Sequence, residues 1–107
     1  MPQVKISPLA SQDLKEIKKY ISTDLESPQA AAKIIKQILK RIKDLEDFPQ
    51  AGGNLSLIIK TQTNYRYVIV GNYIVFYRFE NNVVFIVRIL YGKRDYIDVL
   101  FNPTNMK

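Results

Sequence analysis

The sequence predicts an α+β domain in which a helical hairpin packs on an antiparallel sheet. Segments rich in Val, Ile, Tyr and Phe run from residue 65 to residue 91, separated by short Gly and Asn turns. Two amphipathic segments precede them, and each begins at a Ser-Pro pair. The length of 107 residues suits one small domain with a modest core.

The N-terminal part predicts a strand followed by a helix. Residues 3–7 alternate in polarity over a short stretch, which favours a strand. Ser7-Pro8 then has the form of an N-cap followed by proline at the first helical position. We expect this helix to reach Thr23 or Asp24. Its apolar residues at helical spacing are Leu14, Ile17, Ile21 and Leu25.

A second helix is predicted after Ser27-Pro28, and Phe48-Pro49 ends it. The short connection predicts an antiparallel hairpin. We interpret the apolar stripes of both helices as core, with a partner-binding groove as the alternative. We interpret the basic flank of the second helix as a solvated face. The stripe of the second helix is Ala31, Ile34, Ile35, Ile38, Ile42 and Leu45, and its flank is Lys33, Lys36, Lys40, Arg41 and Lys43.

The second half predicts a four-stranded antiparallel meander. Two-residue turns at Gly71-Asn72 and Asn81-Asn82 would join the last three strands, because Gly and Asn tolerate a positive φ. A short helical turn at 95–101 should close a single domain spanning residues 1–101, with a loose tail at 102–107. The predicted strands are residues 55–60, 65–70, 73–80 and 83–91.

The two turns fix a predicted register, because side chains alternate between the faces of a strand. One face should therefore carry Arg66, Tyr77 and Arg88 among apolar side chains. Charged residues on a covered face are candidates for function. The predicted pairs are Arg66–Tyr77, Tyr77–Ile86, Val68–Val75 and Val75–Arg88.

Composition excludes several kinds of site. The sequence has 16 Lys and Arg against 10 Asp and Glu, no Cys and no His. Thiol nucleophiles, disulfides and His-based triads are therefore impossible, and we expect neither a metal ion nor a cofactor. Residues 48–107 hold seven basic and three acidic residues, so an acidic partner would be attracted there. Without a signal peptide or membrane helix, we expect a cytoplasmic protein.

Several motifs in order resemble the RelE/ParE superfamily of toxins from type II toxin–antitoxin modules. The resemblance covers roughly Val4 to Phe101, and it implies a compact toxin that a cognate antitoxin wraps and neutralises. The motifs are Phe48-Pro49-Gln50-Ala51-Gly52 after the hairpin, Tyr65-Arg66, YIVFYR at residues 73–78, and RILYGKRDY at residues 88–96.

The resemblance implies two different activities. RelE-like members cut mRNA in the ribosome, whereas ParE-like members poison DNA gyrase. Arg66 and Arg94 match arginines of the nuclease pattern, while Lys60 and Tyr96 lie near other functional positions and would have to substitute. The nuclease's two lysines and its tyrosine are replaced by Ile59, Leu57 and Leu100.

RNA cleavage through the 2′-OH needs a base, an acid and cations for the phosphate. Without His, the base would be Tyr or Lys, whose ordinary pKa of about 10 would have to be lowered. The catalytic candidates, if the chain is RelE-like, are Arg66, Arg94 and Tyr96. The binding candidates are Arg66, Tyr77, Arg88, Lys93 and Arg94.

The alternatives at these positions are simpler. Arg66 and Arg88 would neutralise an acidic antitoxin that lies along the sheet and the hairpin, and Tyr77 would pack in the sheet. ParE-like action on DNA gyrase is the preferred hypothesis. A ribosome-dependent mRNA endonuclease is the alternative, and a basic binding domain without toxicity is the third. Whether the chain is an enzyme stays open.

Overall fold

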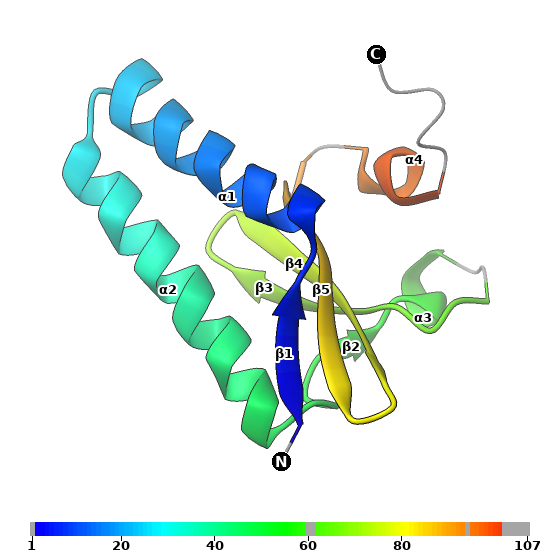
Figure 1. The fold of residues 1–107 in the computed structure, drawn as a ribbon. Coiled ribbons are helices and arrows are strands. Elements are labelled where there is room, and N and C mark those ends of the chain that lie inside the picture. The colour runs from blue at the N-terminus through cyan, green and yellow to red at the C-terminus, as the bar shows by residue number, and fades with distance from the viewer. Residues whose placement is uncertain (1, 60–61, 94, 102–107) are drawn as a thin grey trace.

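The computed structural model describes residues 2–59, 62–93 and 95–101. A helical hairpin covers one face of a five-stranded sheet, and a short C-terminal helix packs on the other face (Figure 1). The predicted α+β fold is therefore confirmed. The elements are β1 (Gln3–Ile6), α1 (Pro8–Lys19), the π-helix η1 (Tyr20–Asp24), α2 (Pro28–Asp47), β2 (Gly53–Asn54), α3 (Ser56–Ile59), β3 (Arg66–Val70), β4 (Tyr73–Glu80), β5 (Val83–Tyr91) and α4 (Tyr96–Phe101).

The strands lie in the order β1-β5-β4-β3-β2. The neighbours from β2 to β5 are antiparallel, and β1 runs parallel to β5. The helical hairpin therefore lies early in the long connection between the two parallel strands. The sequence predicted strand β1 but not its pairing with β5, because parallel pairing joins segments that lie far apart in the chain.

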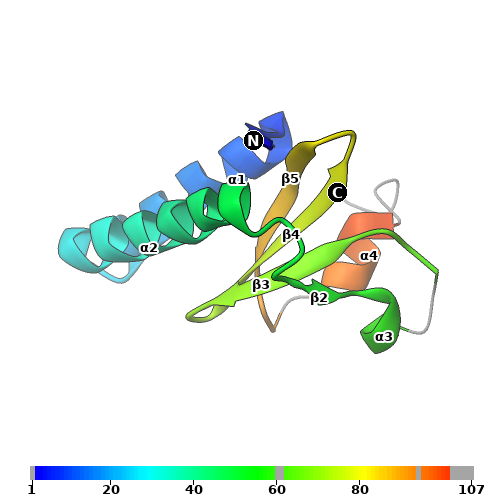
Figure 2. The ribbon, with the colours of Figure 1, turned by 90° about the horizontal axis from the view of Figure 1, so that it is seen from below.

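Local capping explains where the two long helices begin. The side chain of Ser7 accepts a hydrogen bond from the N–H of Ala10 at 2.9 Å. Ser27 does the same for Ala30 at 3.3 Å. The helical conformation after Ser7 continues to Asp24, as predicted, but its last part is a π-helix. The hairpin tip extends beyond the sheet (Figure 2).

The hairpin turns adopt the predicted conformations. Asn81 and Asn82 have φ values of 52° and 61°, and Gly71 has a φ of 58°. These positive values match the twist of the flanking strands. The register predicted from the turns is confirmed up to Tyr77, which pairs with both Arg66 and Ile86.

The predicted strand at residues 55–60 is wrong. The strand β2 ends at Asn54, and a four-residue helix follows. The Asn54 side chain accepts a hydrogen bond from the N–H of Ser56 at 2.9 Å, which turns the backbone out of the extended conformation. Leu55 is buried while Leu57 is 83% exposed, so this segment has no alternating buried face. Lys60 lies outside the described residues.

A β-bulge corrects the predicted register in the last strand. Tyr77 pairs with Ile86 and Phe76 pairs with Arg88, so Val87 is an extra residue in β5. The predicted pair Val75–Arg88 is therefore wrong, and Val75 pairs with Ile89 instead. Beyond the bulge the faces are exchanged, and Ile89 rather than Leu90 packs under the helical hairpin.

The bulge lies where β1 stops and helix α1 takes its place beside β5. The Ser7 hydroxyl donates to the Val87 carbonyl at 2.8 Å. One Asp13 carboxylate oxygen accepts from the Ile89 N–H at 2.9 Å. The same carboxylate accepts from Nε and Nη2 of Arg88, both at 2.8 Å. Side chains of α1 and its cap thus satisfy backbone groups that an unpaired strand edge would leave exposed.

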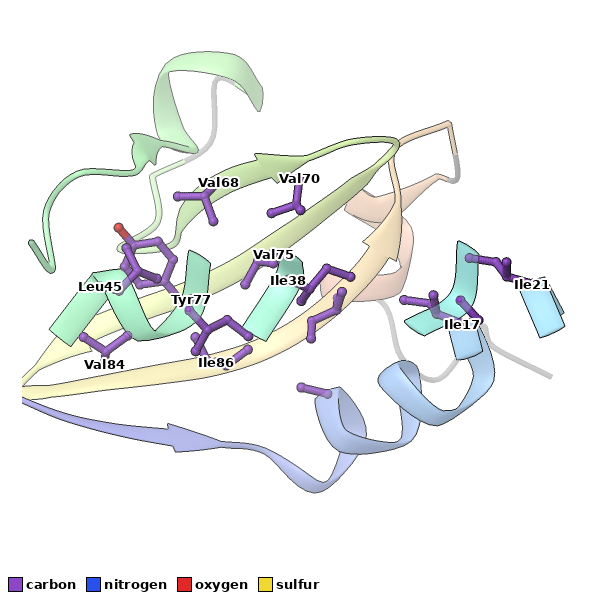
Figure 3. Packing of buried hydrophobic residues seen from close by; sticks show 14 residues of the cluster. Ile17, Ile21, Ile38, Leu45, Val68, Val70, Val75, Tyr77, Val84 and Ile86 are labelled. Carbon is purple, nitrogen blue, oxygen red and sulfur yellow. The ribbon is translucent and has the colours of Figure 1, made fainter. Parts of the chain in front are cut away.

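Two apolar clusters lie on opposite faces of the sheet. The larger lies under the hairpin, where Ile38 and Leu45 of α2 pack against Val75, Tyr77 and other strand residues (Figure 3). The smaller is formed by Leu55, Phe76, Leu90 and Val99, with α4 packed over it. Both faces are therefore partly covered, as the apolar character of both faces predicted.

We predict that Asp13→Ala lowers the free energy of unfolding by about 3–5 kcal/mol, because it leaves the buried Arg88 guanidinium without its carboxylate. Urea denaturation measures the loss. Gln12→Ala is the control, since Gln12 is exposed on the same helix, and its effect should stay within about 0.5 kcal/mol. Equal stability of the two variants would contradict the role of the ion pair.

Candidate functional site

Tyr77 binds the segment that leaves helix α2. Its side chain is fully buried, with 0% exposure. The hydroxyl donates to the Pro49 carbonyl at 2.8 Å and accepts from the Gly52 N–H at 2.9 Å. Burial raises the pKa of the Tyr77 phenol above its ordinary value, which outweighs the opposing effect of the Gly52 hydrogen bond. The phenol therefore stays protonated at neutral pH and is unsuited to act as a base.

Arg66 contacts the same segment. Its Nη1 atom donates to the Gly52 carbonyl at 2.9 Å and to the Gln50 carbonyl at 3.4 Å. A Cβ atom on Gly52 would lie 2.5 Å from the Tyr77 hydroxyl and 2.6 Å from the Tyr67 carbonyl. Only glycine fits this close approach. The Phe-Pro-x-x-Gly motif therefore has a structural reason, which is to bring the backbone against Arg66 and Tyr77.

Arg88 contacts a different part of the molecule from Arg66. It is 8% exposed and forms a bidentate ion pair with Asp13, which lies on helix α1. The hydrogen bonds that Arg88 donates to the Asp13 carboxylate raise the pKa of the Arg88 guanidinium. The shared site predicted for Arg66, Tyr77 and Arg88 is thus divided, because the bulge turns Arg88 toward α1. Arg66 and Tyr77 remain together.

The remaining predicted site residues follow strand β5. Lys93 is exposed just after β5. The ring of Tyr96 packs against Phe76 with a centroid distance of 5.2 Å. Arg94 lies outside the described residues, so its predicted role stays a prediction. The Tyr96 ring thus contributes to the apolar cluster under α4.

The described residues contain no group of three or more His, Cys, Asp or Glu side chains placed to bind a metal ion. A search of the same residues for a membrane-spanning helix finds none.

An apolar groove lies between the hairpin tip and the sheet. Its volume is about 710 Å³. Ile17, Ile21 and Ile34 line the hairpin side of this groove, and Ile89 with the β3–β4 turn lines the sheet side. The other lining residues are Asp13, Glu16, Tyr20, Leu25, Ala30, Tyr73, Leu90 and Tyr91.

Aromatic and apolar side chains remain exposed at the rim of this groove. Leu25 is 56% exposed and Tyr20 is 50% exposed, although Leu25 was predicted to be core. The rings of Tyr73 and Tyr91 pack edge to face with centroids 5.9 Å apart. Burial raises the pKa of the Tyr73 phenol, and the neighbouring Tyr20 and Tyr91 add to this effect. The sequence predicted core for the apolar stripes, with a partner-binding groove as the alternative, but it did not predict that a groove would lie at the hairpin tip.

The outer edge of β3 is open next to the groove. Strand β2 pairs only with Arg66 and Tyr67, so no described strand pairs with the outer edge of β3 at residues 68–70. Ile69, in this stretch, is 63% exposed. A smaller hollow of about 260 Å³ joins Ile69 to Gly71, which also lines the groove. Open edges and exposed apolar groups of this kind are features of surfaces that bind partners.

We predict that Tyr77→Phe lowers the free energy of unfolding by about 1–3 kcal/mol, because the Pro49 carbonyl and the Gly52 N–H each lose a buried partner. Thermal or urea unfolding measures this change. The matched control is Tyr91→Phe, whose hydroxyl lies on a partly exposed ring and should contribute less than about 0.5 kcal/mol. If both variants lose the same stability, the anchoring role of Tyr77 is wrong.

The structure is similar to toxin–antitoxin structures that share little sequence with it. It superposes on a chain of the chromosomal ParDE toxin–antitoxin system from P. aeruginosa with a TM-score of 0.73 and 22% identity, covering 87% of this chain and 98% of the other. For a chain of the RelBE2 toxin–antitoxin complex from Mycobacterium tuberculosis, the TM-score is 0.62 and the identity 18%, covering 85% and 99%. At these identities the likeness supports the fold.

The sequence itself matches a defined family. Residues 4–96 match the family described as the ParE toxin of the type II toxin–antitoxin system, parDE. No curated protein is significantly similar to the chain in sequence. The family match spans nearly the whole domain and agrees with the fold. The chain therefore belongs to the family of ParE toxins of type II toxin–antitoxin systems.

Proposed function

We propose that this toxin inhibits growth by poisoning DNA gyrase in the cytoplasm and that a cognate antitoxin neutralises it. The observation that carries the proposal is the match of residues 4–96 to the ParE toxin family. The similar P. aeruginosa structure is that of a ParDE toxin–antitoxin system, and the M. tuberculosis structure is that of a RelBE2 toxin–antitoxin complex. By analogy, we infer an antitoxin partner for this chain.

The contacts of Arg66, Tyr77 and Arg88 favour ParE-like action over RNA cleavage. A nuclease needs a base of lowered pKa and cations directed at the phosphate. Tyr77 has a raised pKa and two backbone partners, and Arg88 is neutralised by Asp13. Arg66 donates to the backbone of residues 50 and 52. These side chains therefore hold the fold together, and ParE-like action needs no catalytic constellation.

The groove is where we expect the antitoxin to bind. An amphipathic helix would place its apolar face against Ile17, Ile34 and the exposed Leu25, and an extended segment would continue along the open edge of β3. Because Arg88 is already paired with Asp13, acidic antitoxin residues would have to reach Arg66, Lys93 or Arg94 instead. The apolar groove should therefore supply most of the affinity.

We predict that the purified toxin stabilises DNA cleavage by gyrase and leaves mRNA on purified ribosomes intact. Tyr96→Phe should keep gyrase poisoning within about threefold of the wild type, because a ParE-like toxin does not use this hydroxyl for proton transfer. A nuclease would instead lose on the order of 100-fold or more. Specific mRNA cleavage on ribosomes would overturn the gyrase proposal, and absence of both activities would favour a non-toxic binding domain.

A second prediction concerns the antitoxin, taken as the protein encoded beside the toxin gene. Leu25→Lys should weaken binding roughly 10- to 100-fold, because it places a charge in an apolar contact worth about 1.5–3 kcal/mol. Calorimetric titration measures the affinity. The control is Phe48→Lys, which changes an exposed apolar residue that does not line the groove. Equal weakening by both variants would show that the groove is not the binding site.

A further inference from the structure

The outward side of helix α2 carries a stripe of four lysines, Lys33, Lys36, Lys40 and Lys43, called here the lysine stripe. All four are exposed. At about 100° per residue, spacings of three, four and three residues place them within one narrow arc of the helix. This arc lies opposite the buried residues of α2, which are Ala31, Ile38, Ile42 and Leu45. The lysine stripe therefore points away from the core.

The charge of the lysine stripe is poorly compensated. Residues 28–43 contain five basic residues and no Asp or Glu, and the acidic residues of α2 come afterwards, at Asp44, Glu46 and Asp47. The one ion pair found for these four lysines among the described residues joins Lys40 to Asp44 at 3.8 Å. The two side chains are 78% and 47% exposed, so this pair contributes little. Such segregation maintains a local positive potential.

The surroundings of the lysine stripe limit the kind of partner. A helix that lies on a membrane needs a free apolar face, and the apolar face of α2 is buried under the sheet. A stable protein interface usually has aromatic, Met or Arg side chains at its centre, whereas the stripe offers only lysines, with Leu39 exposed beside it. A partner recognised by charge alone, with regularly spaced anions, fits these features best.

We propose that the lysine stripe binds the phosphate backbone of duplex DNA without reading its sequence. The stripe spans about 15 Å along the helix at 1.5 Å per residue. Duplex DNA carries one negative charge per about 1.7 Å of its axis, so several phosphates lie within reach. Lysines act as point charges toward phosphate and carry no base specificity. The choice of DNA over RNA rests on the proposed gyrase target, whose substrate is duplex DNA.

The lysine stripe and the groove are separate surfaces. The groove is lined on α2 by Ala30 and Ile34, and none of the four lysines lines it. A partner in the groove would therefore leave the lysine stripe accessible. We expect the toxin to bind DNA with or without an antitoxin in the groove. The lysine stripe is thereby distinguished from the groove, where we expect the antitoxin to neutralise the toxin.

The test uses the full chain and a fluorescein-labelled 20-base-pair DNA duplex, with fluorescence anisotropy read between 50 and 150 mM salt and no gyrase present. If the four lysines contact about four phosphates, the affinity of the wild type should fall roughly 50-fold over this range. The variant K33Q/K36Q/K40Q/K43Q should lose most of this salt dependence and bind at least about tenfold more weakly at 50 mM.

A matched control separates the lysine stripe from net charge. K5Q/K15Q/K18Q/K19Q removes the same charge from exposed lysines of β1 and α1, and it should bind DNA within about threefold of the wild type. Equal weakening by the two variants would overturn the proposal, as would tighter binding to duplex RNA or to anionic lipid vesicles. Because gyrase is absent, a failure here leaves the gyrase assay unaffected, and a failure of gyrase poisoning leaves DNA binding intact.

Discussion

The constraint on which the rest of this structure depends is the edge of β5 beyond Ile86, where β1 no longer pairs with it. Strand β1 ends at Ile6, so the backbone of Val87 and Ile89 must find other partners. Ser7 and Asp13 supply them from helix α1 and its cap. The carboxylate of Asp13 also forms an ion pair with Arg88. Arg88 was predicted to bind a partner, but this ion pair instead connects strand β5 to helix α1 of the hairpin.

Local chemistry explains what the sequence predicted correctly. Ser-Pro caps marked both long helices, and the Asn81-Asn82 turn fixed the register of β4 and β5 as far as Tyr77 and Ile86. The prediction failed at Val87, whose carbonyl accepts a hydrogen bond from Ser7, because counting residues from a turn takes no account of a partner that lies 80 residues earlier in the chain. A similar failure at residues 55–60 arose from a side-chain hydrogen bond that competes with strand pairing.

The site could be predicted only in part for the same reason. Composition excluded Cys and His chemistry, and the pairing of Arg66 with Tyr77 was correct. What these side chains contact depends on the loop after α2, and alternation along strands carries no information about such a loop. The hairpin tip, which η1 and Leu25 help to form, extends beyond the sheet (Figure 2). Tyr20 and Leu25 line the groove there and stay exposed. Arg66 and Arg88 thus hold other segments against the sheet. The groove, the open edge of β3 and the lysine stripe remain for partners.

The most direct test of this account is native-state hydrogen exchange of the backbone N–H of Ile89 compared with that of Ile69. Both residues lie on strands whose edges have no neighbouring strand at that point within the described part of the chain. The N–H of Ile69 points to the open edge, because the Tyr65 carbonyl accepts from the Leu55 N–H on that side and backbone groups alternate along the strand. The account predicts that Ile89 exchanges as slowly as the buried centre of the sheet, whereas Ile69 exchanges quickly. Comparable fast exchange at both positions would contradict the claim that Asp13 and helix α1 complete the edge of β5.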